Sequence, residues 1–347
     1  MKEGIICVLV CMLMIVGTIV PVSATTLSEK SSLIRGKTLY VGGSGPNNYT
    51  KIQDAVNASS NGDTVFVYAA SSPYYENVIV NKSITLIGED EQTTVLYYAG
   101  GNNAPIFLQA NGCTVQRFTM ARSFYGIRIE SKNNTITNNT LFDNTEGFHL
   151  YKANNSKIEG NTISHNSVGM CVTFTTGDKI SANTITNNTY DGIELYTTEM
   201  TLVTLNNISG NGQFGLSIGG DNNTILKNNI VDNKFFGVHI QNSRKNSILQ
   251  NNIYDNQFGN AGVFTDMWSE LLRRPFNNTW NGNYWGRSYQ FPKVIIEGKE
   301  LLLPSGILFW FIRKYITHNP EEAFPMGIII PIITFDRHPA QKPYDIP

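Results

Sequence analysis

The chain has 347 residues, of which 15% are charged and 41% hydrophobic, and its formal net charge at pH 7 is -1. Proteins that bind nucleic acid through its phosphates carry a basic patch or a basic stretch. This sequence has no such stretch, and asparagine and threonine dominate its polar positions. The composition therefore argues against nucleic acid as a partner.

Residues 1–24 are organised like a secretory signal peptide. They comprise a charged start, an apolar run from Ile5 to Val20 and a small-residue cleavage site at Val22-Ser23-Ala24. The apolar run is 16 residues long, whereas roughly 18–20 are needed to cross a bilayer. We therefore expect cleavage and export, with no stable transmembrane span in the mature chain, which is then secreted or held at the cell surface.

Few cysteines remain after this cleavage. Cys7 and Cys11 lie within the signal peptide, which leaves Cys113 and Cys171. The repeat described below places these two in different coils and on different faces, and a disulfide requires a short Cα–Cα distance. We predict two unpaired thiols, at least one of them buried.

We divide the chain into a signal peptide (1–24), a short linker (25–37), a repetitive body with its N-terminal cap (38–286) and a C-terminal cap or tail (287–347). The body is expected to open with strands at Thr38–Val41, Thr64–Tyr68, Asn77–Val80 and Ser83–Gly88. A helix near Lys51–Ala58 is expected after the first strand, with Thr50 as its N-cap. Such a helix would cover the strand edges that a first coil exposes.

From Gly126 to Asn256 the sequence repeats itself every 21–23 residues. Each block opens with a glycine, at Gly126, Gly147, Gly169, Gly192, Gly215 and Gly237. Each block also contains two asparagines five residues apart: Asn139 and Asn144, Asn161 and Asn166, Asn183 and Asn188, Asn206 and Asn211, Asn228 and Asn233, Asn251 and Asn256. Two markers locked to one period identify a repeat architecture. A degenerate coil at Thr114–Thr119 precedes the first block.

Within each block, short apolar alternations mark about three strands rather than one helical stripe. A unit of this kind is one coil of an all-β, right-handed parallel β-helix, in which neighbouring coils bury the apolar positions. Asparagines in register can hydrogen-bond along the axis, and they tolerate the left-handed turns that separate the sheets. The regular Ile, Leu and Val positions exclude an asparagine-rich disordered tract.

After the last block we expect an insertion at residues 260–276 and then one final coil. Its interior would be closed by aromatic side chains, the first of them in the isoleucine position: Trp280, Tyr284 and Trp285. Leu301–Ile312 and Met326–Phe335 are apolar but too short to cross a membrane. We expect them to form a cap on the last coil, with a membrane-facing patch as the alternative.

Several stretches resemble a known family. The run Tyr49–Glu89 resembles the entry segment of the pectin-lyase-like β-helix superfamily, and its continuation into asparagine-rich coils resembles the NosD-like branch. The NYWG run at Asn283–Gly286 and the tail Phe335–Pro347 resemble the C-terminal part of secreted NosD-like proteins, chiefly archaeal. That branch is described as periplasmic copper-binding or as carbohydrate-binding and sugar-hydrolysis (CASH) repeats. The resemblance implies a parallel β-helix that handles carbohydrate or copper.

One face of this β-helix carries the candidate site. In the strand after each opening glycine, the inward columns are Ile127, Phe148, Met170, Ile193, Leu216, Val238 and Ile129, Leu150, Val172, Leu195, Ile218, Ile240. By alternation, the outward columns are Arg128, His149, Cys171, Glu194, Ser217, His239 and Glu130, Tyr151, Thr173, Tyr196, Gly219, Gln241. The preceding turns add Tyr125, Tyr190, Asp191, Phe214, Phe235, Phe236 and Phe258.

Aromatic rings beside carboxylates and histidines suit sugar recognition by stacking and hydrogen bonding. We predict that the ligand-binding side chains are His149, Tyr151, Tyr190, Asp191, Glu194 and Tyr196. The alternative is a solvated face whose aromatic side chains cover the gaps between coils.

Catalysis is a second hypothesis for the same face. Glycoside hydrolysis needs two carboxylates roughly 5–9.5 Å apart. Asp191, Glu194 and Glu146 could meet this spacing, because coils stack about 4.8 Å apart. The motifs of known β-helix hydrolases, lyases and esterases are missing from the sequence, so these residues are candidates without a family motif behind them.

A metal site is implied by the family resemblance alone. His149 and Cys171 share a column in adjacent coils and are suitable ligand types, but two ligands make a poor copper site. His239 lies three coils beyond Cys171, about 14 Å away, and cannot join them. No cofactor is therefore predicted, with copper kept as an expectation from the resemblance.

The sequence thus predicts a secreted or cell-surface β-helix protein that binds a polysaccharide or surface glycan, or serves a structural role, without catalysis of its own. A polysaccharide-processing hydrolase or lyase and a periplasmic copper-handling accessory protein are the alternatives.

Overall fold

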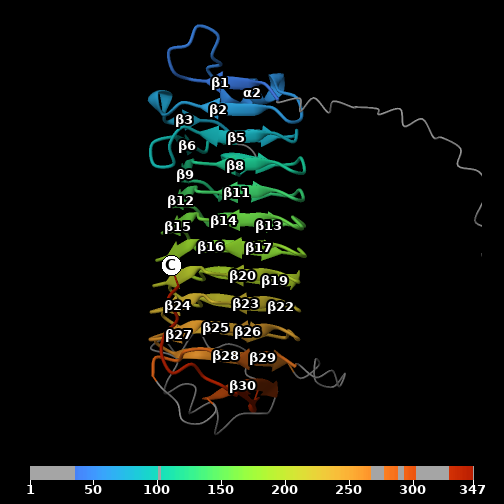
Figure 1. Cartoon of the computed structure of the whole chain (residues 1–347), viewed down its shortest axis with the longest axis vertical. Helices are drawn as coiled ribbons and strands as arrows, with labels where there is room; N and C mark the ends of the chain where they lie inside the picture. The colour runs from blue at the N-terminus through green and yellow to red at the C-terminus, as the bar shows by residue number, and fades with distance from the viewer. Residues whose placement is uncertain (1–35, 101–102, 267–276, 288–292, 302–327, 347) are drawn as a thin grey trace, which may run out of the picture. The chain divides into compact units, whose positions relative to one another are not determined.

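The computed structural model describes residues 36–100, 103–266, 277–287, 293–301 and 328–346. The predicted signal peptide with Cys7 and Cys11, nearly all of the linker at 25–37, and most of Leu301–Ile312 lie outside these residues. From Gly36 onward the chain forms one compact unit. The predicted parallel β-helix is confirmed, because strands of successive coils pair in parallel and stack on one another (Figure 1).

Each complete coil contributes one strand to each of three stacks. The first stack holds β4 (Val78–Val80), β7 (Ile106–Leu108), β10 (Tyr125–Ile129), β13 (Glu146–Tyr151), β16 (Val168–Thr173), β19 (Ile193–Glu199), β22 (Leu216–Asp221), β25 (Phe236–Gln241) and β28 (Gly259–Asp266).

The second stack holds β1 (Thr38–Val41), β2 (Thr64–Val67), β5 (Thr85–Gly88), β8 (Thr114–Gln116), β11 (Thr135–Thr137), β14 (Lys157–Glu159), β17 (Lys179–Ser181), β20 (Leu202–Thr204), β23 (Thr224–Leu226), β26 (Ser247–Leu249) and β29 (Thr279–Asn281). The third stack holds β3 (Tyr74–Tyr75), β6 (Val95–Tyr97), β9 (Thr119–Ala121), β12 (Thr140–Phe142), β15 (Thr162–Ser164), β18 (Thr184–Thr186), β21 (Asn207–Ser209), β24 (Asn229–Val231) and β27 (Asn252–Tyr254).

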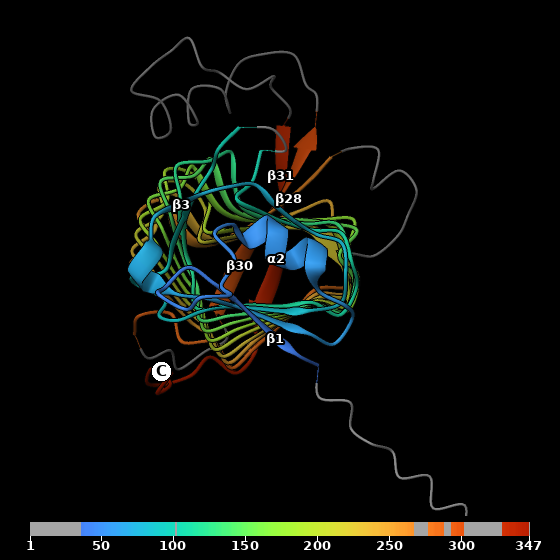
Figure 2. The ribbon, with the colours of Figure 1, turned by 90° about the horizontal axis from the view of Figure 1, so that it is seen from above.

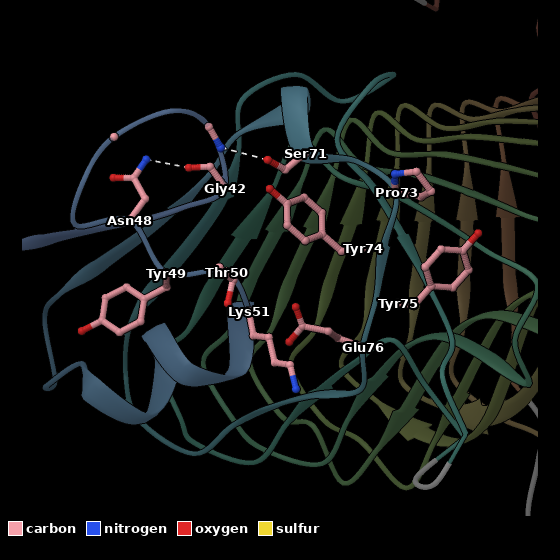
Figure 3. A pocket seen from close by; sticks show the side chains of 12 residues that line it. Gly42, Asn48, Tyr49, Thr50, Lys51, Ser71, Pro73, Tyr74, Tyr75 and Glu76 are labelled. Atoms are coloured by element: carbon pink, nitrogen blue, oxygen red, sulfur yellow. Dashed lines mark hydrogen bonds between the residues drawn. The ribbon is translucent and has the colours of Figure 1, made fainter.

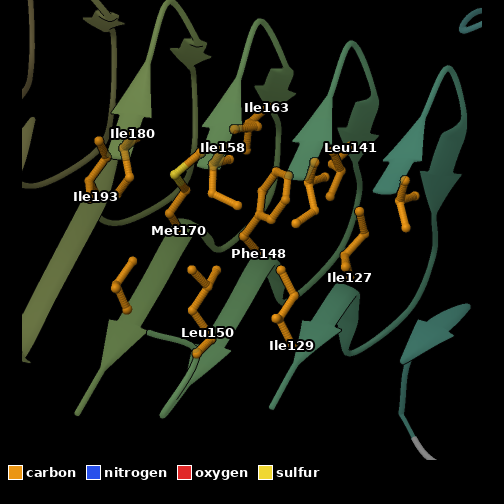
Figure 4. Close-up of a cluster of buried hydrophobic side chains, with 14 of the residues drawn as sticks. Ile127, Ile129, Leu141, Phe148, Leu150, Ile158, Ile163, Met170, Ile180 and Ile193 are labelled. Atoms are coloured by element: carbon orange, nitrogen blue, oxygen red, sulfur yellow. The ribbon is translucent and has the colours of Figure 1, made fainter. Parts of the chain in front are cut away.

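The interior of the coil is an aliphatic column. Phe148 stacks between Ile127 and Met170 along the first stack, and all three are fully buried (Figure 4). Both inward columns predicted from the sequence are buried along their whole length. Burying one such side chain contributes about 1.5–3 kcal/mol, so the repeat gains this stabilisation at several positions in every coil.

The two predicted asparagine columns form hydrogen-bonded ladders at the corners of the coil. In the first ladder, both Nδ2 and the backbone N–H of Asn139 donate to Oδ1 of Asn161, each at 3.0 Å. The pattern continues along the first ladder through Asn183, Asn206, Asn228, Asn251 and Asn283. The second ladder runs in the same way through Asn144, Asn166, Asn188, Asn211, Asn233 and Asn256. These side chains are buried, and the ladder supplies the partners that buried amides require.

The ladder asparagines are not the left-handed turn residues, contrary to the sequence-based expectation. Positive φ occurs one residue earlier, for example at Asn138 (53°), Ala182 (54°) and Leu205 (59°). The corner thus accepts alanine and leucine as well as asparagine. The recurrence of asparagine follows from the ladder and not from the turn.

α2 (Ile52–Ala58) lies across the N-terminal end of the coil (Figure 2). Its Ile52, Ala55 and Val56 are fully buried, so the helix covers an interior that the first coil would otherwise expose. No helix within the described residues is long and apolar enough to span a membrane.

The expected N-cap at Thr50 is wrong. Lys51 occupies the N-cap position and makes no side-chain capping bond. The N–H groups of Ile52 and Gln53 instead donate to the carboxylate of Glu76, at 2.8 and 3.0 Å. An anionic group is favourable at a helix N-terminus, and this one comes from a distant part of the chain that no local rule could identify.

A hollow of about 430 Å³ lies beside this cap, near the short 3₁₀ helix η1 (Ala69–Ser71) (Figure 3). Three of the polar side chains that line it form hydrogen bonds within the cap itself. Asn48 donates to the carbonyl of Gly42 at 2.6 Å, Ser71 accepts a backbone N–H, and Glu76 caps α2. We therefore assign the hollow to the cap rather than to a ligand.

At the C-terminal end, β28 continues the first stack to Asp266, so the inserted stretch begins later than the expected residue 260. β29 places Trp280 opposite Ile248, in the predicted isoleucine position. Trp280 and Trp285 are buried, whereas Tyr284 is half-buried. β30 (Lys293–Leu301) joins β28 in parallel and pairs with β31 (Ile328–Asp336) in antiparallel fashion.

The first asparagine ladder ends on a carboxylate. Asp336 is fully buried and accepts hydrogen bonds from the N–H groups of Gly282 and Asn283, Nδ2 of Asn283 and Nε1 of Trp285. It occupies the position that the asparagine of a further coil would take. The ladder thereby ends without an unsatisfied donor, although Asp336 lies in the segment that follows the coils.

We predict that Asp336→Ala lowers the free energy of unfolding by about 3 kcal/mol or more, because several buried donors lose their acceptor. Urea unfolding followed by tryptophan fluorescence measures the change. Asp345→Ala, at an exposed position of the same tail, is the control and should unfold like the wild type. Equal stability of the two variants would show that the ladder does not need this end.

A buried carboxyl group also occupies a position at which later coils carry an asparagine. Asp178 is 1% exposed, and its Oδ1 accepts the N–H of Ser156 at 2.7 Å. In later coils the equivalent acceptors are the neutral amides of Asn223, Asn246 and Asn278. Burial raises the pKa of Asp178 to about 6, so the ionised form is costly in the folded state.

We predict that Asp178→Asn stabilises the protein at pH 8 and that the gain shrinks at pH 5. A carboxyl group whose pKa is raised by folding contributes stability at low pH and loses it as pH rises through the folded-state pKa, here about 6. Asn keeps the acceptor oxygen and carries no charge. Thermal melts at the two pH values check this, with the exposed Asp232→Asn as control. A pH-independent difference would contradict the prediction.

Candidate functional site on the first stack

The glycine that opens each block decides which side chains face outward. A Cβ atom on Gly147 would lie 2.6 Å from the carbonyl oxygen of Gly169 and 2.8 Å from Cγ2 of Ile163, so this position points inward and admits no side chain. Phe148 also points inward. Two successive inward residues shift the alternation, and Glu146 and His149 therefore share the outward face.

The outward column predicted from the sequence is formed by residues that are direct neighbours in adjacent strands. We call it the central column: Arg128, His149, Cys171, Glu194, Ser217 and His239. Adjacent strands lie about 4.8 Å apart, so side chains of consecutive coils touch. The glycine shift adds a second column beside it, which contains Tyr125, Glu146, Asp191, Phe214 and Phe236.

Glu146, His149 and Cys171 form the closest group of possible metal ligands among the described residues. One carboxylate oxygen, one imidazole nitrogen and the sulfur all lie within 4.8 Å of one another. Nδ1 of His149 is 2.8 Å from Oε2 of Glu146. The ring of Tyr125 stacks on His149 with centroids 4.2 Å apart, which fixes the plane of the imidazole.

Acidic groups continue from this cluster into the next coil. Glu194 interacts with Cys171 and with Asp191, and the N–H of Phe214 donates to Oδ1 of Asp191 at 3.0 Å. Burial, reinforced by the charge of Glu194, raises the pKa of Asp191 to about 7. Burial and the neighbouring Glu146 raise the pKa of Glu194, and the same two causes raise the pKa of Cys171 to about 12.

The predicted site residues therefore divide into two kinds. His149, Asp191 and Glu194, with Glu146 and Cys171, form a connected polar group across β13, β16 and β19. The predicted tyrosines flank this group on both sides. Tyr190 is 49% exposed in the turn before β19, and Tyr196 is 63% exposed in the middle of β19.

Tyr151 stands on the same side as Tyr196, in a short aromatic row. Tyr151, Thr173 and Tyr196 are neighbours in adjacent strands. Phe174, which is 50% exposed, packs edge-on against Tyr151 with ring centroids 5.9 Å apart.

His239, the last residue of the central column, is covered, which the sequence did not indicate. His239 is only 9% exposed and stacks on Phe214 with centroids 4.1 Å apart. Its Nδ1 is 3.3 Å from Oγ of Ser217. Burial lowers the pKa of His239 to about 4, so this imidazole is neutral at physiological pH. Outward position in a strand is therefore not the same as exposure.

The sequence did not bring Glu146 together with His149 and Cys171. Strict alternation places residues three apart on opposite faces of a strand, and Glu146 is three residues before His149. The signal that could have found it is the glycine between them. Asp191, Gly192 and Glu194 repeat the same arrangement two coils later. Cys113 and Cys171 are both unpaired, and Cys113 is buried, as predicted.

The fold defines the class of protein as a parallel β-helix. In structure the chain is similar to the A-module of the mannuronan C-5 epimerase AlgE6 of Azotobacter vinelandii, with a TM-score of 0.54, 17% identity, and coverage of 69% of this chain and 82% of that one. It is also similar to an alginate lyase of Paenibacillus sp., with a TM-score of 0.55, 14% identity, and coverage of 72% and 95%. At these identities the likeness concerns the fold alone.

The family follows from the sequence match. A family model described as "Periplasmic copper-binding protein (NosD)" matches residues 56–290, and the chain belongs to this family. A cell surface glycoprotein of Methanothermus fervidus is 31% identical over 94 residues. That match covers 27% of this chain and 16% of the relative's length.

The family description implies copper, and the donor types of this face can be compared with that expectation. Imidazole nitrogen and thiolate sulfur bind both copper and zinc, whereas carboxylate oxygen suits harder or borderline ions. Glu146, His149 and Cys171 supply one donor of each kind within 4.8 Å. The residues present therefore fit a transition-metal ion.

We predict that acidification from pH 7 to pH 5 destabilises the wild type partly through His239. A buried histidine whose pKa is lowered contributes stability above its unfolded-state pKa and loses it as pH falls towards the folded-state value, here from 6.5 to about 4. His239→Gln should lose less stability over this interval. Urea titrations at the two pH values measure it, and the exposed His165→Gln should behave like wild type. An equal loss in the His239 variant would exclude this residue as the cause.

Proposed function

We propose that this protein is a cell-surface glycan-binding β-helix, and that the glycan lies along the first stack over β13, β16 and β19. The observation that carries the proposal is the pair of exposed tyrosines on either side of the polar group. Tyr190 and Tyr196 are 49% and 63% exposed, and Glu194 lies between them in the sequence, in β19.

The chemistry of this face suits a sugar chain. Tyrosine presents an apolar ring with a polar tip, so it can pack against the C–H face of a sugar and hydrogen-bond a hydroxyl. The carboxyl groups of Glu146 and Glu194 offer acceptors for further hydroxyls. A cleft is not required, because a polymer running along the stack contacts several coils at once.

Location at the cell surface is part of the proposal. The predicted signal peptide supports export, and a cell surface glycoprotein is similar over part of the chain. The family description names the periplasm, which is also outside the cytoplasm. All three point to an extracytoplasmic protein that meets polysaccharide outside the cell.

A polysaccharide-processing enzyme is the second candidate, and the pKa of Asp191, raised to about 7, favours it. Such a group can act as a general acid or base near neutral pH. Asp191 and Glu194 interact directly, which is closer than the roughly 5 Å or more that glycoside hydrolysis requires. We therefore rank binding above hydrolysis and include product analysis in the test.

We predict that Tyr196→Ala and Tyr190→Ala each weaken binding of any glycan found on an array by about tenfold, or about 1.4 kcal/mol. The matched control is Tyr75→Ala. Tyr75 is 64% exposed but lies in β3 of the third stack, so its removal should leave affinity unchanged. Isothermal titration calorimetry measures the affinities.

Chromatography of each glycan after incubation distinguishes binding from turnover. Product formation that Asp191→Asn abolishes would replace binding by catalysis as the function. Equal losses in all three tyrosine variants would place the binding site elsewhere.

A further inference from the structure

We infer that Glu146, His149 and Cys171 form a binding site for one divalent transition-metal ion of the zinc type. The inference does not depend on glycan binding. It starts from the fact that three different side chains, from two adjacent strands, bring an oxygen, a nitrogen and a sulfur donor within 4.8 Å of one another.

The backbone places these donors in fixed positions. His149 and Cys171 are paired residues of β13 and β16, and Gly147 turns Glu146 to their side of the strand. The ring of Tyr125 holds the imidazole plane at an interplanar angle of 26°. Preorganised ligands of this kind lose little conformational freedom on binding a metal.

The distances fit after a small rotation. Zinc binds sulfur at about 2.3 Å and nitrogen or oxygen at about 2.0–2.2 Å, so ligand atoms of one ion lie roughly 3–4 Å apart. His149 Nδ1 and Glu146 Oε2 are 2.8 Å apart in a hydrogen bond. Opening this contact by rotation of the Glu146 carboxylate makes room for an ion between them.

The donor set selects the ion. Copper(I) prefers sulfur and imidazole ligands, whereas a carboxylate beside one thiolate and one imidazole suits a borderline divalent ion. Three protein ligands leave a fourth position for water, as in zinc sites that keep an open coordination position. The side chains of His149 and Glu146 are 18% and 19% exposed, so an ion can enter from solvent.

The surrounding charges also favour a cation. Glu194 adjoins Cys171 on the side away from His149, and its negative charge adds to that of Glu146. The thiol must lose its proton to bind the ion, and a bound cation stabilises the thiolate directly. The ion therefore meets one carboxylate in the site and a second one beside it.

We would test the site with Co²⁺ as a spectroscopic probe of zinc. Residues 25–347, which contain the compact unit that starts at Gly36, are purified under reducing conditions and freed of metal with a chelator. The expected result is one equivalent of Co²⁺ with a thiolate-to-cobalt charge-transfer band, displaced by one equivalent of Zn²⁺. The melting temperature should rise with the bound ion.

The chain offers matched controls for each ligand type. Cys171→Ser should abolish the charge-transfer band and weaken Zn²⁺ binding at least tenfold, whereas Cys113→Ser should retain both. His149→Gln and Glu146→Gln should also weaken binding, whereas His165→Asn, in an exposed turn with φ of 56°, should not. Circular dichroism confirms that each variant is folded.

Two results would overturn the assignment. Equal cobalt spectra for Cys171→Ser and Cys113→Ser would remove Cys171 from the site. Binding of Cu⁺, measured by competition with a copper(I) chelator, without binding of Zn²⁺ or Co²⁺ would replace the zinc-type ion by copper. Loss of metal binding without loss of glycan affinity, or the reverse, separates this inference from the proposed function.

Discussion

The corners of the coil depend on buried amides that satisfy one another. Oδ1 of Asn206 accepts both the N–H and Nδ2 of Asn183, and its own Nδ2 donates to Asn228 and to the carbonyls of Ile180 and Thr204. At these two corners the ladder itself supplies the partners that the buried amides need. The ladder keeps its asparagines in register even where a coil contains extra residues. Asn251 still donates to Asn283, 32 residues further on, because the extra residues lie between two ladder positions.

Because the repeat is in register from coil to coil, the sequence determines which side chains line up on the surface. Residues at equivalent positions of successive coils form one column, with about 4.8 Å between neighbours. The residue at that position in each coil therefore determines the side chain that the coil adds to the face. The opening glycines add a second outward column to the first stack. They bring the residue before the glycine to the same face as the residue two after it, and the pairs Glu146 with His149 and Asp191 with Glu194 both arise in this way.

Local pattern and period were enough to predict the coils, the inward columns and the position of Trp280, because each depends on a repeat that is visible in the sequence. The features that escaped prediction depend on contacts between distant segments. Glu76 caps α2 from 24 residues away, and Asp336 ends the ladder 53 residues after Asn283. On the candidate face, the alignment of the central column was predicted from the repeat, whereas the grouping of Glu146 with Cys171 required the glycine shift.

The column that the glycine shift adds changes in character along the first stack. At the position before the glycine, β13 carries Glu146, and the coil two further on carries Asp191. In the next two coils that position is occupied by Phe214 and Phe236, whose rings stack over His239 at 4.1 and 6.5 Å. Beside Glu146, His149 keeps 18% of its side chain exposed, although the ring of Tyr125 stacks on it. Beside Phe214 and Phe236, His239 is 9% exposed, and burial lowers the pKa of its imidazole. The boundary between β19 and β22 therefore separates a face that carries carboxyl groups from one on which aromatic rings pack against each other.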